Sequence, residues 1–513
     1  MTILADRARL LAAAHALDAH PVEAGPIVGG RLIDTAAREA RCSPNDRRHR
    51  VGWVRDAGPA EIDDAFARAR AAQPAWNARG GAGRAVVLRA MGDALEAARE
   101  RLCALAVREA GKTWPDAIAE VREAVDFCRY YASEAERLFG APTELRGPVG
   151  ETNTLQLHGR GVFVCISPWN FPLAIFTGQI AAALAAGNAV LAKPAEQTPL
   201  IAAEAVRLFH GAGLDPDLLA LLPGPGETVG AALTGHAGLD GVAFTGGTET
   251  AWAINRTLAE RRGPIAPLIA ETGGLNGMFV DTSALREQVI DDVVVSAFGS
   301  AGQRCSALRL LFLPHETADS LIEGIRGAMD ALVVGDPADP ATDMGPVIDE
   351  EARQALEAHF TRLQSEATHL HRITTHGPAE GLYFAPVLAD IPSLDLIERE
   401  VFGPILHVLR YDPEHMEATA AALAAKGYGL TLGVHSRLDS FAEKVQRLVP
   451  AGNVYVNRSI IGAVVGVQPF GGEGLSGTGP KAGGPFALLR YASERAVSVN
   501  IAAQGGDPAL LNL

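Results

Sequence analysis

One cysteine in a glycine-rich segment has the setting of a nucleophile. Cys305 lies in Gly299-Ser-Ala-Gly-Gln-Arg-Cys-Ser-Ala307, after an apolar stretch, and the small residues before it leave room for a carbonyl group. The thiolate is the reactive form, and Arg304 and the loop amides could favour that charge. Taken alone, such a residue could equally be a buried structural cysteine. Three other motifs favour catalysis: Pro168-Trp-Asn-Phe-Pro172, Glu271-Thr-Gly-Gly274 and Glu400-Val-Phe-Gly-Pro404.

The composition is that of a soluble globular protein with room for two or three domains. The chain has 513 residues, of which 48% are hydrophobic and 20% are charged, and this length can bury large cores. The net charge of −15 argues against nucleic acid or an anionic membrane as the main partner.

Cysteine usage and hydropathy favour a reducing compartment. The five cysteines are scattered and form no Cys-x-x-Cys pair, so neither a disulfide framework nor a metal site is predicted: Cys42, Cys103, Cys128, Cys165 and Cys305. No apolar run reaches the ~20 residues of a membrane-spanning helix, and the N-terminus lacks a signal-peptide core. We therefore predict a cytoplasmic protein.

Alternating strand and helix patterns predict the scaffold that positions the motifs. Helical spacing predicts helices over 1–20, 60–73, 85–111 and 115–139, and a β-hairpin is predicted over 145–158. Strands follow at 161–167, 189–192, 218–222 and 241–245, and they alternate with helices at 176–186, 200–211, 228–233 and 250–262. This alternation predicts a mainly parallel, doubly wound α/β sheet, which binds nucleotide cofactors at the carboxyl ends of its strands.

Glycines and charges near the strand ends favour a dinucleotide. Residues 224–230 have the pattern Gly-x-Gly-x-x-x-Gly, one residue longer than the usual fingerprint. Gly246 and Gly247 end a strand and open a helix, where small residues let a pyrophosphate approach the helix N-terminus. Lys193 and Glu196 follow another strand, and a carboxylate there can accept ribose hydroxyls and repel a 2′-phosphate. A plain surface acid is the alternative for Glu196.

The motifs together resemble the aldehyde dehydrogenase superfamily, from about Pro26 to Val499. The motifs Pro-Trp-Asn-Phe-Pro, Lys-Pro-Ala-Glu, Phe-Thr-Gly-Gly, Glu-Thr-Gly-Gly, Gly-Gln-Arg-Cys and Glu-x-Phe-Gly-Pro occur in that order. Within the superfamily, the stretches 161–176, 299–307, 461–472 and 499–506 are similar to the L-glutamate γ-semialdehyde (1-pyrroline-5-carboxylate) dehydrogenase module of proline utilization A. The chain contains no proline dehydrogenase barrel, so we expect an excised module, with that domain in a parent chain, rather than a stand-alone relative.

The resemblance implies a catalytic mechanism. Cys305 would attack the aldehyde to give a hemithioacetal, and hydride transfer to NAD would leave a thioester. The side-chain amide of Asn170 and the backbone N–H of Cys305 would hold the oxyanion. Glu271 would then activate water as a general base.

The resemblance also implies the cofactor contacts. Lys193 and Glu196 match the adenosine-ribose pair, and Gly246 and Gly247 lie against the pyrophosphate. Gly247 departs from many relatives, which have Ser there, and Ala251 stands where many have Gly. At the nicotinamide end, Glu400 matches the ribose ligand and Phe402 belongs to the same motif. Trp169 would either pack near the adenine or support Asn170.

The charges of glutamate semialdehyde suggest which residues bind it. Its α-carboxylate needs donors, which Ser306 and the backbone N–H groups of Gly462 and Ala463 could supply. Its α-ammonium needs an acid, and Glu123 is the best match, with Glu120 as the rival. Two aromatic residues could sandwich the methylenes, unless they are ordinary core residues: Phe171 and Phe470.

The expected architecture is the aldehyde dehydrogenase fold with three parts. A Rossmann-like NAD-binding domain would comprise 22–138 and 160–272, and an α/β catalytic domain would comprise 273–484. A small β flap from 139–159 and 485–500 would pair with a second subunit, because exposed strand edges invite pairing. This arrangement predicts a homodimer.

The expected activity is NAD-dependent oxidation of L-glutamate γ-semialdehyde to L-glutamate, the second step of proline catabolism. The alternatives are an aldehyde dehydrogenase for another semialdehyde or a simple aldehyde, and an inactive domain that serves assembly alone. Retention of Cys305, Glu271 and Asn170 argues against the inactive domain. Glu271 also favours water over coenzyme A as the acyl acceptor.

Overall fold

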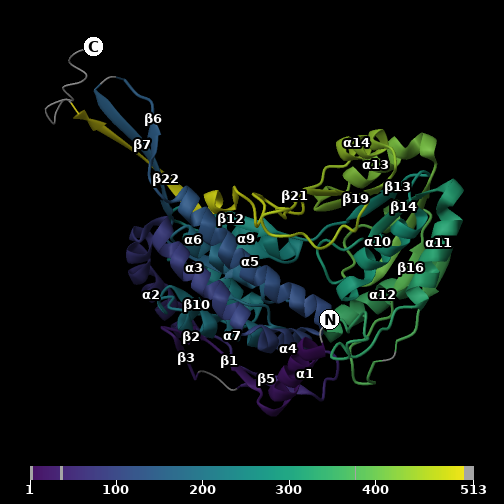
Figure 1. Ribbon diagram of the computed structural model, residues 1–513, viewed down its shortest axis with the longest axis horizontal. Coiled ribbons are helices and arrows are strands. Elements are labelled where there is room, and N and C mark those ends of the chain that lie inside the picture. The colour runs from purple at the N-terminus through teal and green to yellow at the C-terminus, as the bar shows by residue number, and fades with distance from the viewer. Residues whose placement is uncertain (1–3, 35–37, 149, 376, 502–513) are drawn as a thin grey trace.

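A seven-stranded sheet forms the scaffold of the first half of the protein. The computed structural model describes residues 4–34, 38–148, 150–375 and 377–501 (Figure 1). The strand order of this sheet is β12 (Leu268–Glu271), β11 (Gly241–Thr245), β8 (Val162–Ile166), β9 (Ala189–Lys193), β10 (Leu219–Leu221), β2 (Ile27–Val28) and β3 (Arg31–Leu32). The first five strands are parallel, and β2 pairs antiparallel to β10. The predicted doubly wound α/β sheet is therefore confirmed.

Helices connect these strands as the sequence pattern predicts. The crossovers include α6 (Ala174–Ala185), α7 (Pro199–Gly211), α8 (Ala231–Gly235) and α9 (Thr248–Glu260), together with a short π-helical turn over Gly226–Gly230 before α8. The strands β8, β9 and β10 are fully buried. Parallel strands with both faces covered by helices need apolar residues throughout, which explains why these segments read as continuous apolar runs.

An N-terminal layer covers this sheet. It contains α1 (Leu4–Ala19), α2 (Pro59–Ala78), α3 (Gly80–Ala97), α4 (Arg99–Ala110), α5 (Trp114–Leu138) and a small sheet of β1 (Val22–Ala24), β5 (Arg50–Val54) and β4 (Glu39–Cys42). The single helix predicted over 85–111 is wrong. Ala98 leaves the helical conformation with φ −94° and ψ 13°, and it separates α3 from α4. Nothing in the helix-favouring sequence around Ala98 signals this break.

Two buried glutamates bind the N-termini of other helices. The Glu109 carboxylate accepts hydrogen bonds from the backbone N–H groups of Leu200 (2.7 Å) and Ile201 (2.9 Å) at the start of α7. Glu120 Oε1 accepts those of Leu173 (2.9 Å) and Ala174 (2.8 Å) at the start of α6. Helix N-termini favour such carboxylates because their first amides lack partners. Glu120 thus belongs to the scaffold rather than to a solvated helix face.

A second seven-stranded sheet organises the other half of the protein. Its order is β15 (His369–Arg372), β16 (Val387–Asp390), β17 (Ile405–Tyr411), β14 (Leu310–Pro314), β13 (Gly277–Val280), β19 (Thr431–His435) and β20 (Asn453–Val456). Only β15 is antiparallel to its neighbour in this sheet. The helices of this half are α10 (Arg286–Phe298), α11 (His315–Asp330), α12 (Glu350–Glu366), α13 (Met416–Ala424) and α14 (Asp439–Leu448), and β18 (Tyr428–Gly429) pairs with β21 (Glu473–Gly474).

Each sheet has its own hydrophobic core. One core runs from Leu10 to Ala270 and includes the returning residues Ala487, Leu488, Tyr491 and Ala492. The other runs from Leu275 to Ile461. The change of core falls between Ala270 and Leu275, near the predicted domain boundary at 272. The domain limits themselves stay a prediction.

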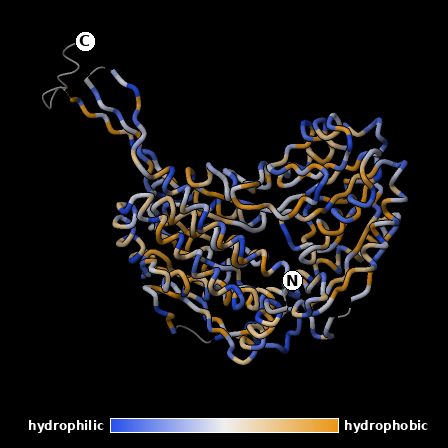
Figure 2. Tube along the Cα trace, viewed as in Figure 1, coloured by the Kyte–Doolittle hydropathy of each residue, from blue (hydrophilic) through white to orange (hydrophobic). Residues whose placement is uncertain are grey.

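A three-stranded flap projects from the first half (Figure 1). It consists of β6 (Thr143–Leu145), β7 (Glu151–Gly159) and β22 (Ala492–Asn500), in the order β22-β7-β6. The antiparallel pairing of β22 with β7 extends from Ala492–Gly159 to Asn500–Glu151. Figure 2 shows hydrophobic and hydrophilic residues intermixed along these strands. The predicted hairpin is confirmed, and its long strand pairs with the C-terminal segment of the same chain.

Within residues 4–34, 38–148, 150–375 and 377–501, no helix combines the length and the apolar character that a membrane crossing requires.

Candidate active site

The loop that carries the candidate nucleophile has an unusual backbone. Helix α10 ends at Phe298 and leads into a short 3-10 turn, in which Ser300 and Ala301 have φ angles of 57° and 55°. Positive φ costs non-glycine residues free energy and persists only where surrounding contacts impose it. Gly302 follows with φ 64°, packed so closely on the Gly403 carbonyl that a Cβ would collide with it. These constraints fix the chain immediately before Cys305.

Cys305 lines a cavity of about 140 Å³ between the two sheets. Eight of the residues predicted from the sequence meet in its wall: Glu123, Phe171, Glu271, Cys305, Ser306, Gly462, Ala463 and Phe470. The predicted oxyanion donor Asn170 is buried next to Phe171 in the chain but does not belong to this wall. The cavity therefore brings the predicted nucleophile and base together with every predicted substrate contact.

The Cys305 thiol is neutral in this setting. Burial, followed by the nearby carboxylates of Glu400 and Glu271, raises its pKa to about 12, against the opposing effect of Arg309. The expectation that Arg304 would favour the thiolate is not supported. The Arg304 guanidinium donates to the Asp116 carboxylate and lies over the Phe171 ring. Cys305 therefore has to lose its proton to a base during the reaction.

Glu271, the predicted base for thioester hydrolysis, lines the same cavity. It is the last residue of β12, and its Oε2 accepts a hydrogen bond from the backbone N–H of Gly472 at 2.8 Å. Its Oε1 is buried, and no described residue forms a hydrogen bond with it. Burial raises the pKa of Glu271 to about 8, although the Gly472 hydrogen bond and the Lys481 ammonium oppose this rise. A carboxylate with a pKa near neutrality is suited to exchange protons at physiological pH.

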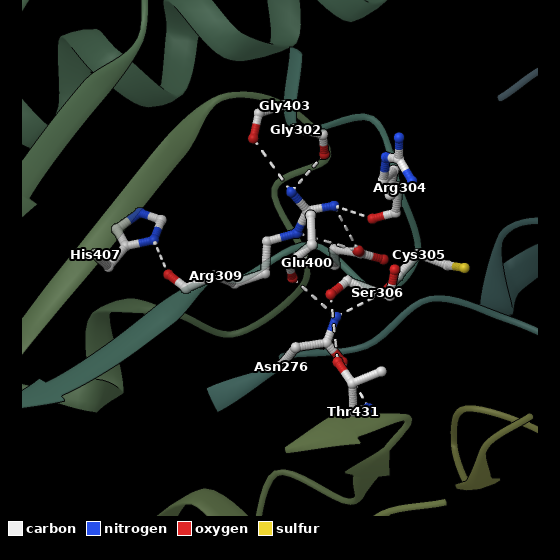
Figure 3. Close-up of polar contacts among 11 residues, drawn as sticks. Asn276, Gly302, Arg304, Cys305, Ser306, Arg309, Glu400, Gly403, His407 and Thr431 are labelled. Atoms are coloured by element: carbon white, nitrogen blue, oxygen red, sulfur yellow. Dashed lines mark hydrogen bonds and ion pairs between the residues drawn. The ribbon is translucent and has the colours of Figure 1, made fainter. Parts of the chain in front are cut away.

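Arg309, which belongs to none of the sequence motifs, joins the Cys305 loop to the Glu400 loop (Figure 3). Its buried guanidinium donates to the carbonyls of Gly302 (2.6 Å), Arg304 (3.0 Å) and Gly403 (3.2 Å). It also donates to Glu400 Oε1 from Nη2 at 2.9 Å and from Nε at 3.2 Å. The planar fork of arginine suits such multiple contacts. A basic residue inside the apolar run 307–313 was the available signal.

A second polar residue holds the backbone on the other side of Cys305. The Asn276 side chain donates to the carbonyls of Cys305 (2.6 Å) and Ala307 (2.9 Å), and it accepts from the Thr431 backbone N–H at 3.1 Å (Figure 3). The Thr431 hydroxyl donates to the Ser306 carbonyl at 3.3 Å. Residues at the amino ends of β13 and β19 thus fix the nucleophile and its neighbour.

The predicted adenosine-ribose residues lie together. Lys193 is buried, and its Nζ is 3.6 Å from Glu196 Oε1, which also accepts the Gly226 backbone N–H at 2.6 Å. At the N-terminus of α9, a Cβ on Gly247 would meet no atom of the described part of the chain within 4 Å. A partly exposed carboxylate and an open helix N-terminus fit a ribose and a pyrophosphate.

At the other end of the predicted cofactor site, two aromatic rings pack together. The Trp169 and Phe402 rings contact edge to face with their centroids 5.5 Å apart. Phe402 also lies under the Arg309 guanidinium, at 5.1 Å. These contacts put Trp169 beside the Glu400 loop, so they do not favour an adenine contact.

Charged residues surround one side of the cavity. Two cations lie over the Phe171 ring: Lys112 Nζ is 4.7 Å and the Arg304 guanidinium 5.5 Å from its centroid. Lys112 is buried and pairs with Glu120 Oε2 at 3.2 Å. Burial and the neighbouring Glu120 raise the pKa of Glu123 to about 8. Of the two rival acids, Glu123 lines the cavity, whereas Glu120 is bound to α6 and Lys112.

The fold is that of the aldehyde dehydrogenase family. The model of the aldehyde dehydrogenase family matches residues 34–497, and the chain belongs to this family. A 1-pyrroline-5-carboxylate dehydrogenase from Geobacillus sp. (strain WCH70) is 35% identical over 486 residues, covering 92% of both chains. The solved structure of 1-pyrroline-5-carboxylate dehydrogenase from Thermus with bound NAD has a TM-score of 0.93 and 33% identity, and the match covers 98% of this chain and 97% of that one.

The bifunctional proteins among the relatives are longer. Bifunctional protein PutA from Klebsiella aerogenes is 47% identical over 510 residues, which cover 97% of this chain but 37% of the relative. A crystal structure of bifunctional proline utilization A is 56% identical with a TM-score of 0.86, covering 88% of this chain and 46% of that chain. The chain thus spans a little over a third of the length of its curated PutA relatives.

Proposed function

We propose that this chain is an NAD-dependent L-glutamate γ-semialdehyde dehydrogenase, which acts in the second step of proline catabolism. The observation that carries the proposal is the shared cavity of Cys305 and Glu271, which also contains donors for a carboxylate and an acid for an ammonium group. The 1-pyrroline-5-carboxylate dehydrogenases, which resemble this chain along nearly their whole length, support the same substrate.

NAD would be held by residues from both halves of the protein. Glu196 and Lys193 would bind the adenosine ribose, Gly246 and Gly247 would border the pyrophosphate, and Glu400, beside Phe402 and Trp169, would bind the nicotinamide ribose. The fit rests on the free space at Gly247 and on the partly exposed Glu196 carboxylate. When bound, NAD supplies a hydride acceptor. Its position next to Cys305 would be set by Arg309, which holds the Glu400 carboxylate and the Cys305 loop together.

The chain's own residues would act on the aldehyde in two stages. The Cys305 thiol would lose its proton to solvent, and the sulfur attacks the carbonyl carbon. The oxyanion receives hydrogen bonds from the Asn170 amide and the Cys305 backbone N–H, and each donor of this kind contributes roughly 3 kcal/mol. After oxidation, Glu271 accepts a proton from water, which attacks the resulting thioester on Cys305 and releases the carboxylic acid.

The substrate's remote charges would orient its aldehyde. Ser306 and the N–H groups of Gly462 and Ala463 would bind the α-carboxylate, and Glu123 would face the ammonium. Phe171 and Phe470 line the same cavity and would enclose the methylenes. Binding energy from such remote groups can serve orientation as well as affinity.

The test is a comparison of glutamate semialdehyde with propanal, which lacks both charges. The unmutated protein should prefer the semialdehyde in kcat/KM, and glutamate should compete with it. Ser306→Ala should lower kcat/KM for the semialdehyde by roughly tenfold to a hundredfold, because one hydrogen bond to a charged group is lost. The same change should leave propanal turnover nearly unaltered.

Two outcomes would contradict this assignment. Equal losses for both aldehydes would mean that Ser306 only packs beside Cys305. Equal kcat/KM values of the unmutated protein for glutamate semialdehyde and for other semialdehydes or simple aldehydes would favour an aldehyde dehydrogenase with a broader substrate range.

The cofactor proposal predicts a preference for NAD over NADP. The Glu196 carboxylate would repel a 2′-phosphate. Glu196→Gln should therefore lower the ratio of kcat/KM with NAD to kcat/KM with NADP. Steady-state rates with both cofactors measure this ratio. The control is Glu227→Gln, which changes a neighbouring exposed acid. Asp349→Asn would be a poor control, because the Asp349 side chain caps the N-terminus of α12. Equal use of both cofactors by the unmutated protein would remove Glu196 from the ribose site.

We further propose a cytoplasmic homodimer with the flap at its interface. Among the described flap residues, β6 and β22 each have one outer edge without a partner strand, and such edges favour pairing with another chain. The NAD-binding domain would comprise 22–138 and 160–272, the catalytic domain 273–484, and the flap 139–159 and 485–500. The longer bifunctional relatives support a proline dehydrogenase domain as a further partner.

A further inference from the structure

One face of α10 makes a row of hydrogen bonds to the loop that precedes Gly462. The residues Gln288, Asp292 and Ser296 are spaced by four along the helix, so their side chains point the same way. Gln288 Nε2 donates to the Asn457 carbonyl at 2.7 Å, and the Asp292 carboxylate accepts the backbone N–H of Ser459. Ser296 Oγ accepts the backbone N–H of the next residue, Ile460, at 3.1 Å. We call these three side chains the α10 ladder.

The same helix leads directly into the Cys305 loop. Ser296, which is only 1% exposed, accepts the Leu308 backbone N–H with its own carbonyl at 2.9 Å. One buried residue therefore contacts the segment just after Cys305 and, through its hydroxyl, the segment just before Gly462. Buried hydrogen bonds of this kind fix relative positions, because breaking them leaves polar groups unsatisfied.

The ladder lies outside the cavity. The charged or titratable groups that interact with Asp292 are His435 of β19, whose Nε2 is 3.5 Å from Asp292 Oδ2, the adjacent Asp291, and Arg458 of the loop itself. Arg458 donates to the carbonyls of Ser459 (3.2 Å) and Ile461 (3.4 Å) and so stiffens the same loop. None of the three ladder residues borders the cavity.

We propose that the α10 ladder sets the distance between the Cys305 sulfur and the backbone N–H groups of Gly462 and Ala463, and thereby selects aldehydes whose carboxylate lies at the right distance from the carbonyl. This inference rests on the function proposed above. Gln288, Asp292 and Ser296 are positioning residues, since they act on the substrate only through the loop that they hold. Their loss loosens the carboxylate anchor and leaves the reacting groups in place.

The experiment compares Asp292→Ala, Asp292→Asn and Asp291→Ala. Asp292→Ala removes the acceptor of the Ser459 N–H, so kcat/KM for glutamate semialdehyde should fall about tenfold and the inhibition constant of glutamate should rise by a similar factor. Propanal turnover should change less than about twofold, since propanal has no carboxylate to anchor. Asp292→Asn retains an oxygen acceptor and should stay near the unmutated protein. Asp291→Ala, an exposed neighbour on the same helix, is the matched control.

The readout separates positioning from general structural support. Asp292→Ala could instead lower turnover of both aldehydes equally, or leave inhibition by glutamate unchanged. Either result would mean that the ladder does not position the carboxylate-binding N–H groups, and the inference would be overturned. Gln288→Ala changes the partly exposed end of the ladder and carries less risk to folding. It should lower the ratio of kcat/KM for glutamate semialdehyde to kcat/KM for propanal about threefold. An unchanged ratio also overturns the inference. If the unmutated protein itself shows no preference for the semialdehyde, the proposed function fails first.

Discussion

Cys305→Ala is expected to bind NAD and to form no NADH from any aldehyde. Without the sulfur, no covalent adduct can form from which the hydride could leave. Removing a nucleophile of this type lowers turnover by about 10⁴-fold or more. The measurement is NADH absorbance with saturating aldehyde, combined with titration of NAD binding to show that the cofactor site is intact.

The other cysteines provide the control for this prediction. Cys42 is exposed, and Cys103 is buried with its thiol directed at the Ala117 carbonyl. Cys42→Ser should therefore keep full activity. Substantial turnover by purified Cys305→Ala would show that another group attacks the aldehyde.

Glu271→Gln is expected to release about one equivalent of NADH per site and then to stall. An amide cannot accept the proton of the attacking water, so the thioester on Cys305 accumulates and steady-state turnover falls by roughly 10²–10⁴-fold. Rapid-mixing absorbance resolves the burst from the slow phase. The absence of a burst would mean that Glu271 is indispensable earlier, as the acceptor of the Cys305 proton.

The elevated pKa of Glu271 also predicts a pH dependence. Glu271 accepts a proton only when ionised, and burial raises its pKa to about 8. Thioester hydrolysis should therefore slow as the pH falls through about 8 and approach a plateau above it. In Glu271→Gln, the rate of the slow phase should no longer fall as the pH is lowered through this range. A fall in rate that persists in the variant would belong to another group.

Several residues that line the cavity could be selected from the sequence because their motifs are short and local. The strand predicted over 241–245 coincides with β11, whereas the neighbouring edge strand β12, which ends at Glu271, was not predicted. Apolar runs bounded by glycine determine such strands, and residues at their ends must meet at one edge of the sheet. The cavity thus brings together eight predicted residues that span positions 123 to 470.

The contacts that hold these residues were not predictable in the same way. Arg309 joins Gly302 to Glu400, which is 91 residues away in sequence, and its partners follow from tertiary packing alone. Glu120 was the rival of Glu123 for the substrate ammonium, but it binds the N-terminus of α6, a contact that only the tertiary structure shows. Arg304 was misinterpreted for the same reason, because its partner Asp116 lies on α5.

The flap has a consequence for how the chain is synthesised. Strand β7 ends at Gly159, and its partner β22 begins only at Ala492, about 330 residues later. At roughly 5–20 residues per second, a ribosome needs on the order of 15–70 s to make the intervening segment. During that interval one edge of β7 and the places of Leu488 and Tyr491 in the first core stay empty. The nascent protein therefore carries an exposed strand edge until β22 emerges. This stage of synthesis is the one most open to binding by chaperones or to premature pairing between neighbouring nascent chains.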